Sequence, residues 1–304
     1  MSAIAVSTLH QVGKAHRLAL GTAQFGLPYG VANTQGQVPM AMVESMLKFA
    51  ADSCIDTIDT AIGYGDSERV LGSIGVSAFK IVSKLTPLPV AVADAGDWVM
   101  REIEASLARL KVDRLHGLLL HHSADLHGAS GFALYSAMQK LKSEGRVKKI
   151  GISIYSPAEL DNCIGKYDFD LIQSPFNLVD HRLQVSGWLS RLKAQGCEVH
   201  VRSAFLQGLL LMPRAAIPSK FERWKTTWNA WHRWLLQHDA DAVSACMEYP
   251  LSFVQIDRVV VGANNLEQLR QITAAVGGND VKLLFPDLGC TDENLINPSR
   301  WPEL

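Results

Sequence analysis

The segment IDTIDTAIGYGDSE, residues 55–68, joins two features that decide the fold of this chain. Its first residues mix apolar and polar types up to Asp59, and we interpret them as a β-strand. A turn bracketed by Gly63 and Gly65 follows at once and carries Tyr64. A strand that ends on a carboxylate and leads into a tight turn with a phenol predicts a chemical site, rather than a piece of the core.

Along the rest of the chain, short apolar runs alternate with longer segments in which apolar residues recur at helical spacing. One such segment contains Val43, Met46, Leu47 and Ala50. The sequence predicts eight strands, at residues 18–21, 55–59, 80–84, 117–121, 149–153, 171–173, 199–203 and 258–262. Eight strand–helix units in about 250 residues are typical of a closed parallel barrel. We therefore predict an α/β protein with a (β/α)8 TIM barrel.

The predicted organisation is a single domain over residues 1–304, with the barrel at about residues 18–278. Extended loops are expected after the seventh strand, and an irregular tail over residues 279–304. An open doubly wound sheet is the alternative, and its first strand would lead through a glycine fingerprint into a helix. Here GTAQFG at residues 21–26 runs into Leu27-Pro28-Tyr29-Gly30, which predicts a long loop and excludes that fold.

Charge and cysteine content limit the partners and the compartment. The 304 residues include 29 basic and 30 acidic side chains, for a net charge of −1, so we expect no binding to nucleic acid or to a membrane. The sequence shows neither a signal peptide nor an apolar run long enough to span a bilayer. Its five cysteines lack the close spacing of metal sites, and we expect them to be reduced in a cytoplasmic protein.

In a parallel barrel, the carboxyl ends of all strands meet at one mouth, where chemistry is found. The predicted strand ends are all polar or glycine, and they carry Gly21, Thr22, Asp59, Lys84, His121, Ser153, Gln173, Arg202, Ser203 and Gly262. An aspartate, a lysine and a histidine therefore follow one another on three successive strand ends, which favours a catalytic site.

These residue types suggest proton transfer. Free tyrosine ionises near pH ~10, and a nearby ammonium lowers that pKa, so we expect Lys84 to make Tyr64 a usable proton donor. Asp59 would hold Lys84 protonated through a charge-assisted bond, and His121 would fix the angle of a substrate oxygen. Taken alone, an Asp–Lys pair is equally consistent with a structural salt bridge. Together, the four residues fit a carbonyl group that receives a hydride.

Several motifs resemble the aldo-keto reductase family and run through most of the chain. They are GTAQFG (21–26), DTAIGYGDSE (59–68), SK (83–84), SLARLKVDRLHGLLLHH (106–122), GRVKKIGIS (145–153), QSPFN (173–177), RSAFLQGLL (202–210) and VGANNLEQL (261–269). The resemblance implies an (α/β)8 barrel that reduces aldehydes or ketones without a metal. It assigns the catalytic tetrad to Asp59, Tyr64, Lys84 and His121.

The resemblance also implies NADPH as the cofactor, with NADH as the alternative. Its expected contacts are Ser153 and Gln173 for the nicotinamide, Ser203, Phe205, Leu206 and Gly208 for the pyrophosphate, and Gly262, Ala263, Gln268 and Gln271 for the adenosine. The strand-end residues Gly21, Thr22, Asp59 and Arg202 complete the expected cofactor-binding set.

Three positions depart from the family pattern. Ile154 stands where many members have an asparagine bonded to the carboxamide, and Arg202 stands where many stack a tyrosine on the nicotinamide. A planar guanidinium can also stack on a ring, and it adds positive charge. Gln268 replaces an arginine that grips the 2′-phosphate, which weakens the expected preference for NADP. Arg270 is near in sequence, but helix geometry points it elsewhere.

The substrate is expected to be a small carbonyl compound, an aryl aldehyde or a sugar. The residues expected to line its pocket are Phe25, Tyr29, Ile62, His122, Phe176, Trp224 and Trp228. Trp224, Trp228 and Trp231 also share helical spacing, so a helix packed on the barrel is the other interpretation of this segment.

Two other functions remain open. One is a non-catalytic regulatory subunit that binds a nicotinamide cofactor, although a pure binder has no need of a proton donor. The other is a cofactor-free barrel enzyme that uses Lys84 as a Schiff-base nucleophile, although Asp59 would keep that amine charged and unreactive. We expect a monomer or a weak oligomer in every case.

Overall fold

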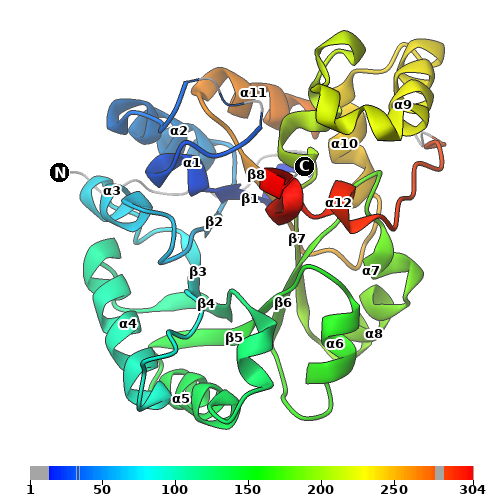
Figure 1. Cartoon of the computed structure of the whole chain (residues 1–304). Helices are drawn as coiled ribbons and strands as arrows, with labels where there is room; N and C mark the ends of the chain where they lie inside the picture. Colours follow the sequence, from blue (N-terminus) through cyan, green and yellow to red (C-terminus); the bar gives the residue numbers. More distant parts are fainter. Residues whose placement is uncertain (1–13, 32, 34, 278–283, 304) are drawn as a thin grey trace.

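The computed structural model describes residues 14–31, 33, 35–277 and 284–303. Eight parallel strands close into a barrel in chain order (Figure 1). They are β1 (Leu18–Gly21), β2 (Thr57–Asp59), β3 (Lys80–Leu85), β4 (Leu115–Leu120), β5 (Val147–Ser153), β6 (Leu171–Pro175), β7 (Glu198–Arg202) and β8 (Arg258–Gly262). Strand β1 pairs with β8 from Leu18 opposite Val259 to Gly21 opposite Gly262, which closes the ring. The predicted (β/α)8 barrel is confirmed.

The strand ends differ from the predictions where the local backbone leaves the extended conformation. Strand β2 begins at Thr57 because Cys54 has a positive φ of 61° and the N–H of Ile55 bonds back to Ala50 in the preceding helix. Strand β7 ends at Arg202 because Ser203 has a φ of 64°. His121 follows the last residue of β4 rather than ending it. Each shift leaves the polar residue at the mouth.

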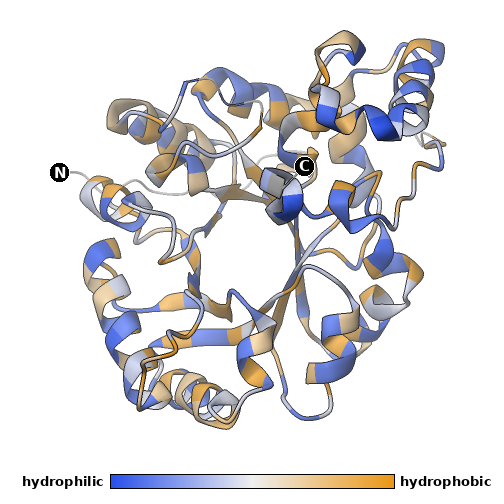
Figure 2. Cartoon of the chain, in the orientation of Figure 1, coloured by the Kyte–Doolittle hydropathy of each residue, from blue (hydrophilic) through white to orange (hydrophobic). Residues whose placement is uncertain are grey.

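Helices surround the barrel (Figure 1). They are α1 (Ala23–Gly26), α2 (Met40–Asp52), α3 (Ser67–Ile74), α4 (Ala95–Leu110), α5 (Gly131–Ser143), α6 (Ala158–Cys163), α7 (Arg182–Val185), α8 (Trp188–Ala194), α9 (Lys225–Gln237), α10 (Ala242–Leu251), α11 (Leu266–Ala275) and α12 (Glu293–Ile296). Hydrophilic and hydrophobic residues alternate along them (Figure 2). In α2 the predicted residues Val43, Met46, Leu47 and Ala50 are buried, so the helical period has positioned the apolar face toward the core.

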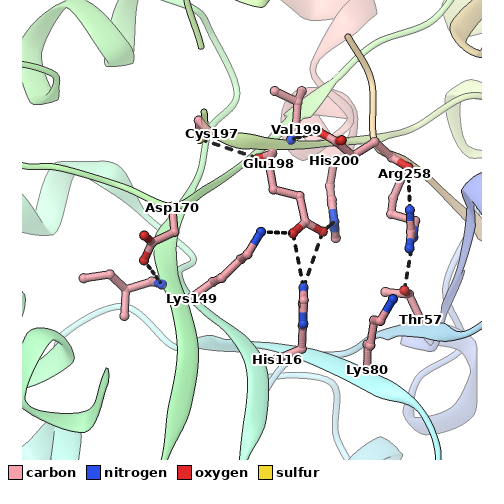
Figure 3. A network of polar contacts seen from close by, with 12 residues as sticks. Thr57, Lys80, His116, Lys149, Asp170, Cys197, Glu198, Val199, His200 and Arg258 are labelled. Atoms are coloured by element: carbon pink, nitrogen blue, oxygen red, sulfur yellow. Dashed lines mark hydrogen bonds and ion pairs between the residues drawn. The ribbon is translucent and has the colours of Figure 1, made fainter. Parts of the chain in front are cut away.

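A polar network joins the amino ends of the strands, opposite the mouth (Figure 3). Glu198, the first residue of β7, accepts hydrogen bonds from His200 at 2.7 Å and from His116 of β4 at 3.2 Å, and it also pairs with Lys149 of β5. Burial alone would raise the pKa of Glu198, but the hydrogen bonds from both histidines and from Lys149 hold it well below its usual range. The carboxylate therefore links three strands at the barrel bottom.

A second hydrophobic cluster lies beside the barrel and is built from the segment between β7 and β8 together with the carboxyl-terminal residues. Trp228 and Trp231 of α9 are fully buried in it, and their indole N–H groups donate to Phe221 O at 2.9 Å and to Leu210 O at 3.0 Å. The extended segment after the seventh strand is thus confirmed. The tail expected to be irregular contains α12 and a 3-10 helix (Pro298–Glu303), and the predicted end of the barrel at residue 278 falls outside the described residues.

Within the described ranges, no helix is long and apolar enough to cross a membrane.

We expect the substitution Trp228→Ala to lower the free energy of unfolding by roughly 3–5 kcal/mol, because it leaves a cavity in the second cluster and removes a buried hydrogen bond. Chemical denaturation monitored by far-UV circular dichroism measures this change. Leu236→Ala on the same helix is the matched control, because Leu236 is 84% exposed. An equally small effect of both substitutions would contradict the packing role of Trp228.

Candidate active site

The turn that carries Tyr64 is held by a close approach between two backbone segments. A β-carbon on Gly26 of α1 would lie 1.8 Å from Tyr64 O, and one on Gly65 would lie 2.5 Å from Gly26 O. Gly65 also has a φ of 54°, a conformation that favours glycine. The N–H of Tyr64 donates to Ala61 O and the N–H of Ser67 donates to Tyr64 O, both at 3.0 Å. These contacts fix the phenol above the end of β2.

A buried ion pair lies beneath this turn. Lys84 Nζ donates to Asp59 Oδ1 at 2.7 Å and to Thr60 O at 2.8 Å, and the two side chains are only 1% and 5% exposed. Gln173 Nε2 of β6 donates to Asp59 Oδ2 at 2.6 Å. Both oxygens of Asp59 are therefore satisfied, which offsets the cost of removing the charges from water. The predicted contact between Asp59 and Lys84 is confirmed.

Tyr64 and His121 lie next to this pair. Lys84 Nζ is 5.2 Å from the centroid of the Tyr64 ring, whose centroid is 6.1 Å from that of His121 in an edge-on arrangement. Burial and then the charge of Asp59 raise the pKa of Tyr64. The expectation that this pKa is lowered is wrong, because the phenol is desolvated and Asp59 places a negative charge nearby. Tyr64 is therefore a neutral phenol at neutral pH.

The histidine is also uncharged. Burial, followed by the charges of Lys84 and Arg202, lowers the pKa of His121 to about 3. The predicted neutral imidazole is consistent with this shift. Burial likewise lowers the pKa of Lys84, while Asp59 raises it again. The site thus holds one ion pair and two neutral rings that can exchange hydrogen bonds with a ligand.

A cavity of about 670 Å³ opens at the carboxyl ends of the strands. It brings together three residues of the predicted tetrad, Asp59, Tyr64 and His121, while Lys84 lies buried behind Asp59. Of the predicted cofactor-binding residues, those that line it are Gly21, Thr22, Asp59, Gln173, Arg202, Ser203, Phe205, Gly208, Gly262, Gln268 and Gln271. Ser153, Leu206 and Ala263 do not line it and are buried.

The loop after β7 has an unusual backbone where it faces the cavity. Ser203, Leu206 and Gln207 have φ values of 64°, 47° and 51°, all in the left-handed region. Asn177 Nδ2 supports the loop by donating to Ser203 O at 3.0 Å. Strain of this kind is tolerated at binding sites when the surroundings fix it, so the loop is a candidate ligand contact.

The predicted substrate pocket is mostly not assembled. Tyr29 lines the cavity, but Phe25, Phe176 and Trp228 are fully buried in hydrophobic clusters. Phe176 stacks on Tyr249 with ring centroids 5.4 Å apart. The other three, Ile62, His122 and Trp224, also lie outside the lining, and Trp224 Nε1 donates to Asp292 Oδ2 at 3.1 Å. The apolar character that suggested a pocket instead reflects packing.

The lining residues that the sequence analysis did not name as site residues include Gln24, Tyr155 and Asn264. Tyr155 and Asn264 follow the ends of β5 and β8 by two residues, so a wider window around each strand end would have found them. Glu159 Oε1 accepts a hydrogen bond from the N–H of Tyr155 at 2.7 Å and fixes its loop. Gln24 lies within the GTAQFG motif but its position across from Gly262 depends on barrel closure.

Polar and ionisable side chains lie together at the carboxyl ends of the barrel strands, which is where barrel enzymes have their active sites. Comparison with known proteins narrows the class. A model described as the Aldo/keto reductase family matches residues 17–279. The chain belongs to the aldo/keto reductase family, and the resemblance noted in its motifs is confirmed.

Curated relatives and solved structures agree with this membership. D-threo-aldose 1-dehydrogenase of Pseudomonas sp is 27% identical over 83% of this chain and 89% of its own length. Pyridoxal 4-dehydrogenase of Microbacterium luteolum is 24% identical over 84% of this chain and 87% of its own. The holo form of an aldo-keto reductase from Bacillus halodurans superposes with a TM-score of 0.71 at 18% identity and covers 92% of each chain, which supports the fold. Membership supports an oxidoreductase of carbonyl compounds.

We expect the His121 ring to stay neutral from about pH 8 to about pH 5, because its pKa of about 3 lies below this range. An unfolded histidine titrates near pH ~6.5, so between pH ~6.5 and about 3 the unfolded chain binds a proton that the folded chain lacks. His121 therefore costs stability as the pH falls through this window. NMR of the ring protons, assigned with His121→Gln, measures the titration, and a midpoint near pH ~6.5 would contradict the prediction.

Proposed function

We propose that this protein is an NAD(P)H-dependent oxidoreductase that reduces an aldehyde or a ketone to an alcohol, with Tyr64 as the proton donor. The observation that carries this proposal is a neutral, half-buried tyrosine that lines a cavity of about 670 Å³ and whose ring centroid lies 5.2 Å from Lys84 Nζ. The names of two relatives include an aldose and pyridoxal, which favours an aldehyde among the candidate substrates.

The residues present fit a nicotinamide dinucleotide. Ser153 Oγ and Gln173 Oε1, at adjacent strand ends, are buried and find no hydrogen-bond partner among the described residues. A carboxamide has both donors and an acceptor: its N–H group would donate to Gln173 Oε1, and its oxygen would accept from the Ser153 hydroxyl. Asn264 Oδ1 on the far side of the cavity is also buried and unpaired. When bound there, the cofactor would supply the hydride.

The side chains of this chain would then handle the proton. Tyr64 keeps its proton at neutral pH, because burial and Asp59 raise its pKa, so it is a donor to an oxygen that gains negative charge. Lys84 would stabilise the phenolate that remains, and Asp59 and Thr60 O hold the ammonium in place. His121 is neutral, so it can hydrogen-bond the substrate oxygen without repelling Lys84 or Arg202.

Two other functions are weighed against the same geometry. Lys84 is 1% exposed and paired with Asp59, which argues against a role as a Schiff-base nucleophile. A regulatory subunit that only binds cofactor would share the cavity but would not depend on the Tyr64 hydroxyl.

We expect Tyr64→Phe to reduce turnover of an aldehyde such as 4-nitrobenzaldehyde by about 10²- to 10⁴-fold, because the ring stays in place without its acidic proton. Steady-state kinetics with NADH and NADPH measure the loss, and tryptophan fluorescence titration checks that cofactor affinity is retained. Tyr135→Phe on α5, whose hydroxyl bonds to Asp168 O outside the cavity, is the matched control. Near-normal turnover by Tyr64→Phe would rule out this proton donor.

The adenosine end of the cavity supports NADH as well as NADPH. The side chains there are the amides Gln24, Asn264, Gln268 and Gln271, and among the described lining residues Arg202 is the one lysine or arginine. Arg270 lies over the ring of Phe49 at 5.7 Å, outside the cavity, as helix geometry predicted. Because a 2′-phosphate is bound best by a charged donor, we propose that NADH is used at least as well as NADPH.

We expect Gln268→Arg to raise the affinity for NADPH relative to NADH by about tenfold or more, because it adds a charge-assisted hydrogen bond at this end. Fluorescence titration of both reduced cofactors gives the ratio. Gln195→Arg, at an exposed position after α8, controls for the added charge. A wild-type protein that already binds NADPH far more tightly than NADH would contradict the proposed cofactor preference.

A further inference from the structure

The Arg202 side chain occupies the cavity beside the residues proposed for proton transfer. It is the last residue of β7, and its Nη2 donates to Ile154 O at 3.1 Å. Its guanidinium carbon lies 4.6 Å from the centroid of the Tyr155 ring. Both contacts lie just beyond the end of β5. The guanidinium therefore leans across β6 toward β5, away from the β8 side that carries Asn264 and Gln268.

The charge of Arg202 has no counterion in the described part of the chain. Among the residues that the structure describes, no carboxylate forms an ion pair with this guanidinium, whose other hydrogen bond reaches Ser203 Oγ at 3.5 Å. Asp59 is the one carboxylate in the described lining, and both of its oxygens are already bound by Lys84 and Gln173. A half-buried cation that faces a cavity without a counterion is a ready site for an anionic group.

This cation lies close to the reacting groups. Burial and Asp59 raise the pKa of Tyr64, whereas the charge of Arg202 acts on it in the opposite direction, and Arg202 also contributes to the low pKa of His121 after burial and Lys84. Its charge is therefore felt where the proposed proton donor and the proposed oxygen-binding histidine meet. A ligand group that binds Arg202 would lie on the substrate side of the cavity.

We propose that Arg202 binds a carboxylate of the substrate, so that the preferred carbonyl compounds are oxo acids, with the acid group and the reacting carbonyl on one small molecule. This proposal rests on the carbonyl reductase function. The planar guanidinium still has N–H groups to form charge-assisted bonds with a carboxylate. The phosphates of a cofactor are the other anions of similar chemistry, and the pyrophosphate is expected at Ser203, which Arg202 also contacts. The guanidinium nevertheless turns toward Ile154 and Tyr155, which favours the substrate, and the experiment below distinguishes the two.

A pair of aldehydes that differ in one charge tests this proposal. We expect wild-type kcat/KM to be higher for 4-formylbenzoate than for its methyl ester. Arg202→Gln should lower kcat/KM for the acid by about 10- to 100-fold more than for the ester, the range of a hydrogen bond to a charged group. Arg202→Lys should retain part of the preference. Arg191→Gln is the matched control, because Arg191 stacks on Trp188 outside the cavity.

The outcomes show whether Arg202 binds the substrate or the cofactor. An equal loss for acid and ester, together with weaker NADH binding in fluorescence titration, would show that Arg202 serves the cofactor and would overturn the proposal. Unchanged kinetics for both aldehydes would also overturn it. Melting temperatures of all variants are compared first, and if Arg202→Gln fails to fold, the acid-to-ester ratio of Arg202→Lys decides, since replacing the planar fork by a point charge should reduce it.

A binding measurement with benzoate tests the proposed carboxylate site without relying on turnover. Isothermal titration of benzoate into the protein saturated with NAD⁺ should show binding to the wild type and to Arg191→Gln, but not to Arg202→Gln. If neither aldehyde is reduced, the proposed reductase function fails, and loss of benzoate binding in Arg202→Gln would still support the anion site. Equal benzoate binding by wild type and Arg202→Gln would overturn it.

Discussion

The ion pair between Asp59 and Lys84 is the interaction on which the mouth of the barrel depends. Moving these two charges out of water costs several kcal/mol each, and the cost is offset only if every polar atom finds a partner. The partners come from three strands: Asp59 from β2, Lys84 from β3 and Gln173 from β6. The pair itself joins the neighbouring strands β2 and β3, whereas the contact from Gln173 of β6 requires the closed barrel. The pair also places a positive charge next to Tyr64.

The two ends of the barrel use polar networks for different purposes. At the amino ends, Glu198 is satisfied by His116, Lys149 and His200, so its charge links strands and leaves little capacity for a ligand. At the carboxyl ends, Ser153 Oγ and Gln173 Oε1 lack partners among the described residues, and Arg202 lacks a counterion there. Unsatisfied groups are costly in a folded protein. Among the described residues the amino-end network leaves His200 Nδ1 unpaired, whereas Ser153 Oγ, Gln173 Oε1 and Asn264 Oδ1 are unpaired at the carboxyl ends, where a ligand would supply the missing contacts.

The sequence was a good guide to position along each strand and a poor one to side-chain direction around the cavity. Asp59, Tyr64 and His121 could be predicted because a parallel barrel brings all its strand ends to one mouth. Phe25, Phe176 and Trp228 were expected in a pocket, yet they are buried in hydrophobic clusters. Phe25 lies in the four-residue α1 and Phe176 follows β6, so neither belongs to a periodic pattern long enough to show whether it faces a cavity or the core. Trp228 lies in α9, where its helical spacing with Trp231 had already indicated packing as the other interpretation.

The sequence by itself determined the strand–helix alternation, the barrel and the order of polar residues at its mouth. These features depend on residues that are close in sequence, because both the hydrophobic periodicity and the end of a strand are local patterns. The tertiary structure alone decided the direction of the pKa shifts in the site: burial among distant segments raises the pKa of Tyr64, which was expected to be lowered, and lowers the pKa of His121. It also decided that Arg202 turns toward Ile154 and Tyr155 rather than toward Gln268. Both outcomes depend on distances between strands that only barrel closure sets.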